Sequence, residues 1–300
     1  MQSVYLQIDC KRPKASQLKK PTPASRHALR YSMSNFCSQH RRMHLSPPSI
    51  AATLSLAVLM IIFGIHAVEE ALSARGRGFD YVAVVPGRGD ARIQKIAQLC
   101  RANGVPLRTM PRDQITRLAK AANHQGVVAV TAETQYGDLD DVLAHKRGQH
   151  AFVLLLDGIE DPHNLGAIIR TAEGAGADGI IIPERRAAGV TGTVIKASAG
   201  AAEYLPIARV TNASRALEDL KSGNIWTVGL DERGDKLYDQ IDYKMDCALV
   251  LGAEGHGLHE QIRKKCDFLV KIPMLGKVPS LNVSVAAAIV MYEVARQRRK

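Results

Sequence analysis

The sequence predicts an α/β protein whose second half is a mostly parallel sheet covered by helices on both faces. From Ala151 onward, short apolar segments alternate with helix-like segments, an order that is typical of parallel sheets. A smaller α/β unit precedes this half, at residues 60–134. Polar, glycine-rich turns follow three of the predicted strands, within residues 161–176, 249–258 and 272–300. Core packing does not require polar side chains at these turns, so they indicate a site for a polar ligand.

Residues 1–59 are expected to form a disordered basic extension. Up to residue 49, nine lysines and arginines stand against Asp9 alone, so this stretch carries +8 of the formal net charge of +11. A segment of this composition cannot bury a core. The charge left for the rest of the chain permits RNA binding without demonstrating it.

An apolar run without Asp, Glu, Lys or Arg, at residues 50–68, follows the basic stretch. This order is typical of a signal peptide or a membrane anchor. A secretory signal is disfavoured, because the basic stretch is much longer than the one such a signal carries and no small-residue cleavage motif is clearly placed. We expect no membrane association, and a single transmembrane anchor is the alternative.

The elements of the smaller unit are predicted from periodicity and from turn residues. Ile65, Val68 and Leu72 have helical spacing, and Asn103 with Gly104 ends a second helix. We expect helices at residues 65–74, 91–102 and 113–121, and strands at residues 81–85, 105–109 and 127–131. Residues 135–150 are polar and mixed in charge, which predicts a linker with one helical turn at residues 139–144.

The larger unit, residues 151–300, alternates strands and helices throughout. Its strands are expected at residues 152–156, 179–182, 205–208, 225–229, 248–251 and 268–272, and its helices at residues 165–175, 193–199, 214–222, 258–265 and 281–298. In parallel sheets of this kind, ligands lie beyond the carboxyl ends of the strands. Asn164, residues 252–255 and residues 280–282 follow predicted strands, so we expect them at one edge of the sheet.

Motifs that the chain lacks disfavour several classes of function. No G-x-G-x-x-G follows the first strand of the larger unit and no G-x-x-x-x-G-K-[ST] is present, which argues against a nicotinamide dinucleotide and against a nucleotide hydrolase. The histidines show no metal-ligand spacing, so no metal is expected. The five cysteines are scattered without a C-x-x-C pair, which predicts free thiols in a reducing compartment and a cytoplasmic protein.

Three motifs carry a family resemblance. They are DPHNLGAIIRTAEGAG at residues 161–176, LVLGAEGHGL at residues 249–258, and the segment from Ile272 that contains Ser280, Leu281 and Asn282. In this order and near these spacings, they resemble the SpoU/TrmH family of SPOUT RNA ribose 2′-O-methyltransferases. The resemblance extends from about residue 63 to the C-terminus, and it is greatest to the bacterial enzymes that methylate a guanosine ribose of large-subunit (23S) rRNA.

The resemblance implies more of the fold than the pattern does. It implies a ribosomal-protein-like substrate-binding domain at residues 60–134 and a SPOUT domain with a C-terminal trefoil knot at residues 151–300. Related enzymes begin near the residue that matches Met60, so residues 1–59 are interpreted as an extension or as the result of a misplaced start codon. The family is dimeric, and the final helix is apolar on most faces, so we expect a homodimer.

The resemblance also implies a cofactor and three residues that hold it. The cofactor of the family is S-adenosyl-L-methionine, bound in a bent form by the loops of the knot. Gly252, Ile272 and Leu281 match the positions that hold its adenosine part, and glycine at 252 lets the backbone approach a ligand closely. The alternative is that all three are only turn residues at strand ends.

Arg170 lies in a helix that is otherwise apolar, so we expect its side chain on the buried side with a partner. One interpretation is a structural ion pair with Glu173 or Glu254. The resemblance instead puts Arg170 at the reacting ribose, as the residue that activates its 2′-hydroxyl. Because a guanidinium is hard to deprotonate, we expect it to stabilise the developing alkoxide and to hold the adjacent phosphate. Action as a general base, assisted by a substrate phosphate, is the alternative.

Four further residues are candidates for catalysis. Asn164 is expected to orient Arg170 or the substrate ribose, or to cap its helix. Glu254 is expected to orient Arg170 or to hold a hydroxyl of the RNA or the cofactor, with a solvated turn residue as the alternative. Ser280 and Asn282 are expected to cap the last helix. The resemblance implies that they also contact the methionine end of the cofactor or the substrate.

The sequence therefore predicts methyl transfer from S-adenosyl-L-methionine to the ribose 2′-hydroxyl of a guanosine in 23S rRNA. Arg185, Arg186 and Lys196 are candidates for phosphate contacts, with ordinary surface charge as the alternative. The same chemistry on tRNA is one rival, disfavoured because the tRNA guanosine enzymes of the family typically lack the substrate-binding domain. The other rival is a non-catalytic RNA-binding assembly factor, against which stand Asn164, Arg170, Glu254, Ser280 and Asn282.

Overall fold

The computed structural model describes residues 59–74, 77–87 and 91–299. Apart from Leu59, the expected disordered extension at residues 1–59, which is also the chain before the expected start at Met60, lies outside these residues. Within the described ranges, no helix is long and apolar enough to cross a membrane. The described part of the apolar run at residues 50–68 forms a strand and then a helix, separated at Gly64, which has a φ of +98°. This part of the run is therefore not one continuous helix.

The first sheet is built from four strands and carries three helices. Along the chain these elements are β1 (Leu59–Phe63), α1 (Ile65–Ala74), β2 (Phe79–Val84), α2 (Ala91–Ala102), β3 (Leu107–Thr109), α3 (Arg112–Ala119) and β4 (Val127–Ala132). The strand order is β1-β4-β2-β3, with β4 antiparallel to both of its neighbours and β3 parallel to β2. The predicted helices and strands are confirmed to within a few residues, but β1 was not predicted.

One short helix, α4 (Leu139–Ala144), follows where the sequence predicted a helical turn. Asp138 accepts a hydrogen bond from the backbone N–H of Asp141, and the Asp141 carboxylate accepts one from the backbone N–H of Asp138. This reciprocal capping satisfies backbone donors at the start of a helix too short to be stable alone.

The second sheet is parallel, as predicted. Its elements are β5 (Phe152–Asp157), α5 (Pro162–Gly174), β6 (Gly179–Pro183), α6 (Gly192–Ala197), β7 (Ile207–Val210), α7 (Ala213–Ser222), β8 (Trp226–Leu230), β9 (Lys236–Leu237), β10 (Cys247–Gly252), α8 (Glu260–Lys265), β11 (Phe268–Lys271) and α9 (Val283–Arg298). The strand order is β7-β6-β5-β10-β8-β11-β9, and all six pairings are parallel. The α/β class is confirmed, and the C-terminal trefoil stays a prediction.

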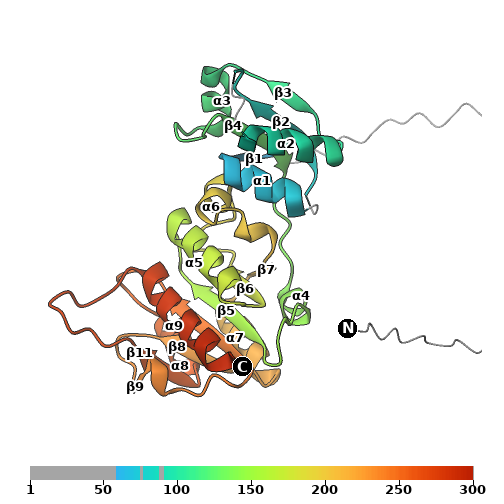
Figure 1. Cartoon of the computed structure of the whole chain (residues 1–300). Coiled ribbons are helices and arrows are strands. Elements are labelled where there is room, and N and C mark those ends of the chain that lie inside the picture. Colours follow the sequence, from blue (N-terminus) through green and yellow to red (C-terminus); the bar gives the residue numbers. More distant parts are fainter. Residues whose placement is uncertain (1–58, 75–76, 88–90, 300) are drawn as a thin grey trace, which may run out of the picture. The chain divides into compact units, whose positions relative to one another are not determined.

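Helices cover both faces of this sheet (Figure 1), and a buried hydrophobic cluster lies on each face. Alternate residues of a strand point to opposite faces, and in β5 the side chains of Leu154 and Leu156 join one cluster while Val153 and Leu155 join the other. The first cluster contains residues of α5, α6 and α9, and the second contains residues of α7 and α8. Every residue of β5 and β10 is buried, which explains why these strands are continuous apolar runs.

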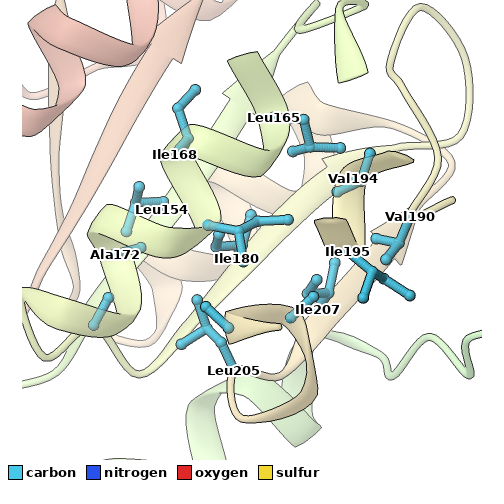
Figure 2. Close-up of a cluster of buried hydrophobic side chains, with 14 of the residues drawn as sticks. Leu154, Leu165, Ile168, Ala172, Ile180, Val190, Val194, Ile195, Leu205 and Ile207 are labelled. Atoms are coloured by element: carbon cyan, nitrogen blue, oxygen red, sulfur yellow. The ribbon is translucent and has the colours of Figure 1, made fainter. Parts of the chain in front are cut away.

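Helix α5 is fixed to the sheet by one apolar face. Figure 2 shows Leu165, Ile168 and Ala172 of α5 gathered with Leu154 and Ile180 of the strands beneath it. Each of these five side chains is at most 1% exposed. Their spacing along α5 is that of a single helical face. This packing holds the first turn of α5 beyond the carboxyl end of β5, where the sequence predicted a site.

The last turn of α9 is tied to the opposite edge of the sheet by Arg298. Its guanidinium donates to the backbone carbonyl oxygens of Tyr243, His150, Ala151 and Met245 at 2.7–3.0 Å. Hydrogen bonds from a charged donor are stronger than neutral ones. Arg298 thereby joins three segments at the amino ends of β5 and β10, and it sets the direction in which α9 runs across the sheet.

Candidate active site

Three loops at the carboxyl edge of the parallel sheet are joined by side-chain hydrogen bonds. The Asn164 amide donates to the Glu254 carboxylate at 3.1 Å, and the Asn282 amide donates to the side-chain carbonyl oxygen of Asn164 at 3.0 Å. The three residues lie in the first turn of α5, in the loop after β10 and just before α9. The sequence predicted that these segments would meet, and the structure brings them together.

The orientation of each amide in this chain is determined by its neighbours. The Asn282 side-chain oxygen accepts from the backbone N–H of Ser284 at 2.9 Å and from its hydroxyl at 2.6 Å. The amide nitrogen of Asn282 therefore faces Asn164, whose own nitrogen is left to face Glu254. An ionised carboxylate only accepts hydrogen bonds, so Glu254 ends the chain. Its remaining lone pairs are free to accept a hydrogen bond from a ligand.

The helix caps differ in part from the expectation. Asp161, not Asn164, caps α5, because its carboxylate accepts the backbone N–H groups of His163 and Asn164. The capping interpretation of Asn164 is therefore wrong, and the Asn164 amide is available for the loop contacts. Asn282 caps α9 as expected. Ser280 is exposed and makes no side-chain hydrogen bond with the residues that the structure describes.

A main cavity of about 590 Å³ opens beside this cluster. Its lining includes five of the eight predicted site residues, which are Gly252, Glu254, Ile272, Ser280 and Leu281. Apolar side chains of Leu230, Leu251 and Ala286 lie among them. Cavities of several hundred Å³ with a mostly apolar lining and a few polar groups are typical of small-molecule sites.

The loop after β10, which forms part of the wall of the main cavity, packs so closely that position 252 must be glycine. A Cβ atom built on Gly252 would lie 2.1 Å from the carbonyl carbon of Gly257 and 2.4 Å from the backbone nitrogen of Leu258. The loop closes on itself there, with Ala253 and Gly257 paired by backbone hydrogen bonds. The predicted reason for glycine was close approach to a ligand, and the structure adds close approach to the loop that follows.

Several charged residues of the main cavity were missed by the sequence reasoning, among them Asp231 and Arg233. Asp231 is 4% exposed and accepts the guanidinium of Arg233 at 2.7 and 2.8 Å. Burial favours the neutral acid, but hydrogen bonds from the Arg233 side chain and backbone outweigh it, so the pKa of Asp231 is lowered. Asp231 directly follows β8. The rule that ligand-binding residues lie at the carboxyl ends of parallel strands, which we call the strand-end rule and which located Gly252, therefore applied to Asp231 as well.

A second hollow, which we call the inner hollow, adjoins the main cavity. Its volume is about 540 Å³, and Asn164 lines it. Glu254, Ala253, His256 and Val283 line both the inner hollow and the main cavity. The Asn164–Glu254 pair thus stands at the boundary between the main cavity and the inner hollow.

The expectation of a buried, paired Arg170 is wrong. Arg170 is exposed, and its side chain has no hydrogen bond or ion pair with any described residue. Glu173 lies 3.8 Å from Arg147 instead, and Glu254 accepts from Asn164. The buried face of α5 is formed by residues spaced three and four apart, and position 170 lies off that face. Arg170 lines neither the main cavity nor the inner hollow.

The three candidates for phosphate contacts fall into two groups. Arg185 and Arg186 are exposed, and neither side chain has a partner among the described residues. Lys196 is half-buried, donates to the backbone carbonyl oxygen of Asn123, and has its pKa lowered by burial. The two arginines are therefore better placed to meet an anion than Lys196.

Metal-ligating side chains and cysteines are scattered in the described part of the chain. No group of three or more His, Cys, Asp or Glu side chains there is arranged to hold a metal ion. Cys100, Cys247 and Cys266 are free thiols, as predicted for them. Burial raises the pKa of Cys100 and Cys247 to about 11 and that of Cys266 to about 12. Such thiols are poor nucleophiles at neutral pH.

Comparison with sequence families agrees with this geometry. Residues 151–292 match the SpoU rRNA Methylase family, and residues 61–137 match the RNA 2′-O ribose methyltransferase substrate-binding domain. A relative from Bacillus subtilis (strain 168), YacO, which is assigned to the TrmH family of tRNA/rRNA methyltransferases, is 45% identical over 240 residues. The aligned region covers 79% of this chain and 95% of YacO.

Solved structures show the same fold. The SpoU methyltransferase AviRb from Streptomyces viridochromogenes, solved in complex with the cofactor AdoMet, is 28% identical, with a TM-score of 0.68 over 80% of this chain and 90% of AviRb. An AdoMet-bound rRNA methyltransferase from Sinorhizobium meliloti is 26% identical, with a TM-score of 0.65 over 81% of this chain and 88% of its own. Together, the sequence matches, the parallel sheet and the three joined loops show that the chain belongs to the SpoU/TrmH family and carries its RNA 2′-O ribose methyltransferase substrate-binding domain.

Proposed function

We propose that the protein transfers a methyl group from S-adenosyl-L-methionine to the 2′-hydroxyl of an RNA ribose, and that its target is a guanosine in 23S rRNA. The observation that carries this proposal is the Glu254–Asn164–Asn282 chain, which stands between the main cavity and the inner hollow. A group-transfer enzyme needs two adjacent sites with positioned polar groups between them. The AdoMet-bound structures of AviRb and the Sinorhizobium meliloti enzyme support the choice of cofactor.

The main cavity fits S-adenosyl-L-methionine in size and lining. Apolar side chains such as Leu230, Leu251 and Leu281 suit an adenine ring, and backbone groups near Gly252 and Ile272 suit the hydrogen bonds of adenosine. Glu232 and Glu254 supply negative charge beside a cationic ligand, whereas the guanidinium of Arg233 largely offsets the charge of Asp231. When bound, the cofactor supplies an activated methyl group on a sulfonium. Gly252, Ile272 and Leu281 hold it, and Ser280 contacts its amino-acid end.

Asn164 and Glu254 position the ribose in the inner hollow. The free lone pairs of Glu254 accept a hydrogen bond from a substrate hydroxyl, and Asn164 keeps the carboxylate in place. Asn282 fixes Asn164 in turn, so alignment of the reacting hydroxyl rests on three segments at once. Methyl transfer of this kind depends mainly on such alignment.

Arg170 acts at the interface of a homodimer. One side of α9 is buried, while the other carries Val285, Ala288, Ile289 and Tyr292, which are exposed or half-buried and share one helical face. Helices α5 and α9 pack against each other, and the Tyr292 hydroxyl lies 3.5 Å from where a Cβ on Gly174 would be. Arg170 precedes Gly174 by one helical turn. A second copy on this surface covers Arg170. Because Arg170 lines neither the main cavity nor the inner hollow of its own subunit, it acts on a ribose bound in the partner subunit, where it stabilises the alkoxide as it forms.

Two further features concern the substrate and the chain's organisation. The substrate-binding domain favours large-subunit rRNA over tRNA, while YacO is assigned to a family of tRNA/rRNA methyltransferases. We place this domain at residues 60–134, a linker at 135–150 and the methyltransferase domain at 151–300.

The homodimer is tested by light scattering on the purified chain, and a monomer at micromolar concentration contradicts it.

Labelled methyl transfer to unmodified rRNA and tRNA, measured in parallel, tests the proposed substrate. We expect incorporation into 23S rRNA, with the product mapped to one guanosine. Incorporation into tRNA alone retains the chemistry and contradicts the choice of substrate. S-adenosyl-L-methionine binding without transfer to either free or assembling rRNA contradicts the enzymatic proposal and favours an RNA-binding assembly factor.

A further inference from the structure

A second positioned side chain, His259, stands at the same edge of the sheet and has no part in the chemistry described above. The last residue of β5, Asp157, is buried and accepts two hydrogen bonds from His259. One comes from the His259 backbone N–H and the other from its ring nitrogen Nδ1, both at 2.9 Å. The His259 side chain is 46% exposed, whereas that of Asp157 is 9% exposed. A buried carboxylate therefore orients an imidazole whose other edge faces outward.

The hydrogen bond to Asp157 determines which ring nitrogen of His259 remains available to a ligand. A carboxylate accepts, so Nδ1 carries the proton, and Nε2 of the neutral ring is an acceptor. The loop that contains His259 packs closely against Gly158. A Cβ on Gly158, whose φ is +89°, would lie 3.3 Å from the Ala253 Cβ, 3.5 Å from His259 Cε1 and 4.0 Å from the Arg186 carbonyl oxygen. Loops after β5, β6 and β10 thus converge at Gly158.

His259 also stands between two hollows. It lines the inner hollow, and it lines an outer hollow of about 490 Å³ that extends to Pro183 and Thr211. Gly158 and Arg186 are the other residues that both hollows share along with His259. A strand of RNA that leaves the inner hollow in this direction passes His259 and Arg186 before it reaches the outer hollow.

Arg186 is available to bind an anion, and its backbone adopts an uncommon conformation. Its side chain is exposed and has no partner among the described residues. Its backbone φ is +57°, which is uncommon for a residue other than glycine and is found more often at functional sites. Glu260, an acid of the outer hollow, is held by Arg263 at 2.8 Å, so its charge is largely offset.

We propose that His259, Arg186 and the outer hollow form a second RNA subsite, which takes the nucleotide next to the methylated one. Arg186 binds the phosphate between the two nucleotides, and Nε2 of His259 accepts a hydrogen bond from the ribose or the base of the neighbour. Asp157 is a positioning residue that acts through His259. RNA-binding proteins hold unpaired nucleotides in this way, with arginine on phosphate and side-chain hydrogen bonds to the sugar or the base. The inference rests on the proposed RNA substrate.

The test is equilibrium binding of a labelled, unmodified 23S rRNA fragment to the full chain at several salt concentrations. We compare the native protein with Arg186→Ala, His259→Ala, Asp157→Asn and the double variant of His259→Ala with Asp157→Asn. His150→Gln is the matched control, because His150 lies 3.5 Å from Asp246 at the opposite ends of β5 and β10. S-adenosyl-L-methionine affinity and melting temperature are measured for each variant.

We expect Arg186→Ala and His259→Ala each to weaken RNA binding about tenfold, as for the loss of one hydrogen bond, while cofactor affinity and melting temperature change little. Arg186→Ala lowers the salt dependence of binding by about 0.7 in the log–log slope, the value for one phosphate contact in single-stranded nucleic acid. His259→Ala leaves that slope unchanged. Asp157→Asn weakens RNA binding less than His259→Ala, and the double variant is no weaker than His259→Ala alone, since Asp157 acts through His259.

RNA affinities of Arg186→Ala and His259→Ala within twofold of the native protein overturn the subsite. An equal loss of RNA affinity in His150→Gln also overturns the subsite, because it would show a general effect of removing a histidine–aspartate pair. If the native protein binds the fragment and these variants lose it, but no methyl group is transferred, the subsite stands and the proposed reaction falls. If the native protein binds no RNA, both fall.

Discussion

The Asn282 side-chain amide donates a hydrogen bond to the Asn164 side-chain oxygen at 3.0 Å, across 118 residues of sequence. Asn282 begins the last helix, and Asn164 lies in the first turn of the helix that follows β5. Through Asn164, the contact continues to Glu254 in the loop after β10. Three motifs that are far apart in the chain therefore make a single polar unit, and the order of the strands brings them together.

Replacement of Asn164 tests this unit. We expect Asn164→Ala to lower the methylation rate roughly 10- to 100-fold, since it removes a hydrogen bond to a carboxylate that is worth about 1.5–3 kcal/mol. Asn164→Asp is the sharper variant, because it keeps the shape but replaces the donor by a second negative charge beside Glu254. Single-turnover kinetics with saturating cofactor measures both variants. Native-like turnover of Asn164→Asp contradicts the role of the donor.

Replacement of Arg170 separates catalysis from binding. Arg170 is exposed and unpartnered in the described part of the chain, so Arg170→Ala should leave stability unchanged. We expect methylation to fall by at least about 100-fold, as for the loss of one oxyanion donor, with RNA affinity within a few fold of the native value. The rate constant of methyl transfer and the RNA dissociation constant are measured on the same preparation. Persistent methylation means that Arg170 has no catalytic role.

Replacement of Gly252 tests the wall of the main cavity. In Gly252→Ala the new methyl group would overlap the backbone of Gly257, so the loop after β10 must shift. Overpacking of this kind costs typically about 1–3 kcal/mol. We expect a lower melting temperature and loss of S-adenosyl-L-methionine binding, measured by calorimetry. Gly255→Ala is a useful comparison, because a Cβ there has no neighbour within 4 Å, although its φ of +80° adds some strain.

Arg298 should matter for stability rather than for chemistry. Arg298→Ala removes a guanidinium that binds four backbone carbonyl oxygens. We expect the free energy of unfolding to fall by about 2–4 kcal/mol, because buried carbonyl groups lose a charged donor. Arg299→Ala is the matched control, as Arg299 is exposed and adjacent in sequence. Denaturant titration distinguishes them, and equal losses for the two variants contradict the account.

Asp231 should contribute to stability in a pH-dependent way. Burial favours its neutral form, but the hydrogen bonds from Arg233 outweigh this and lower its pKa below the ordinary 3.8. A lowered pKa in the folded state stabilises the protein above the unfolded-state value, and that contribution is lost as the pH falls through the folded-state value. We expect the difference in melting temperature between native protein and Asp231→Asn to be constant from about pH 5 to 7 and to shrink below pH 3.8. A difference that grows on acidification contradicts the sign.

Much of the fold was predictable because the strands of the parallel sheet are apolar throughout and are separated by clear turns. The bounds of α1 and α2 agree with the prediction. Strand β1 was missed because Leu59–Phe63 continues into the apolar start of α1, so no polar turn marks the boundary. Gly64, at a φ of +98°, is the residue that separates the two.

The candidate site was predictable only in part. Asn164, Glu254 and Asn282 follow strand ends, and the strand-end rule brought them together correctly. The burial of Arg170 was mispredicted because an apolar neighbourhood in sequence was taken for burial, whereas helical spacing puts position 170 off the packed face of α5. The Asp157–His259 pair is separated by 102 residues, and no spacing in the sequence links them. Tertiary structure alone reveals such a pair.

The most direct measurement is mass spectrometry of nucleosides from 23S rRNA transcripts incubated with S-adenosyl-L-methionine and either the native chain or Asn164→Asp. The account predicts 2′-O-methylguanosine with the native chain and little or none with the variant. A methyl group on a base, a product on a nucleoside other than guanosine, or equal product from the two proteins would contradict it.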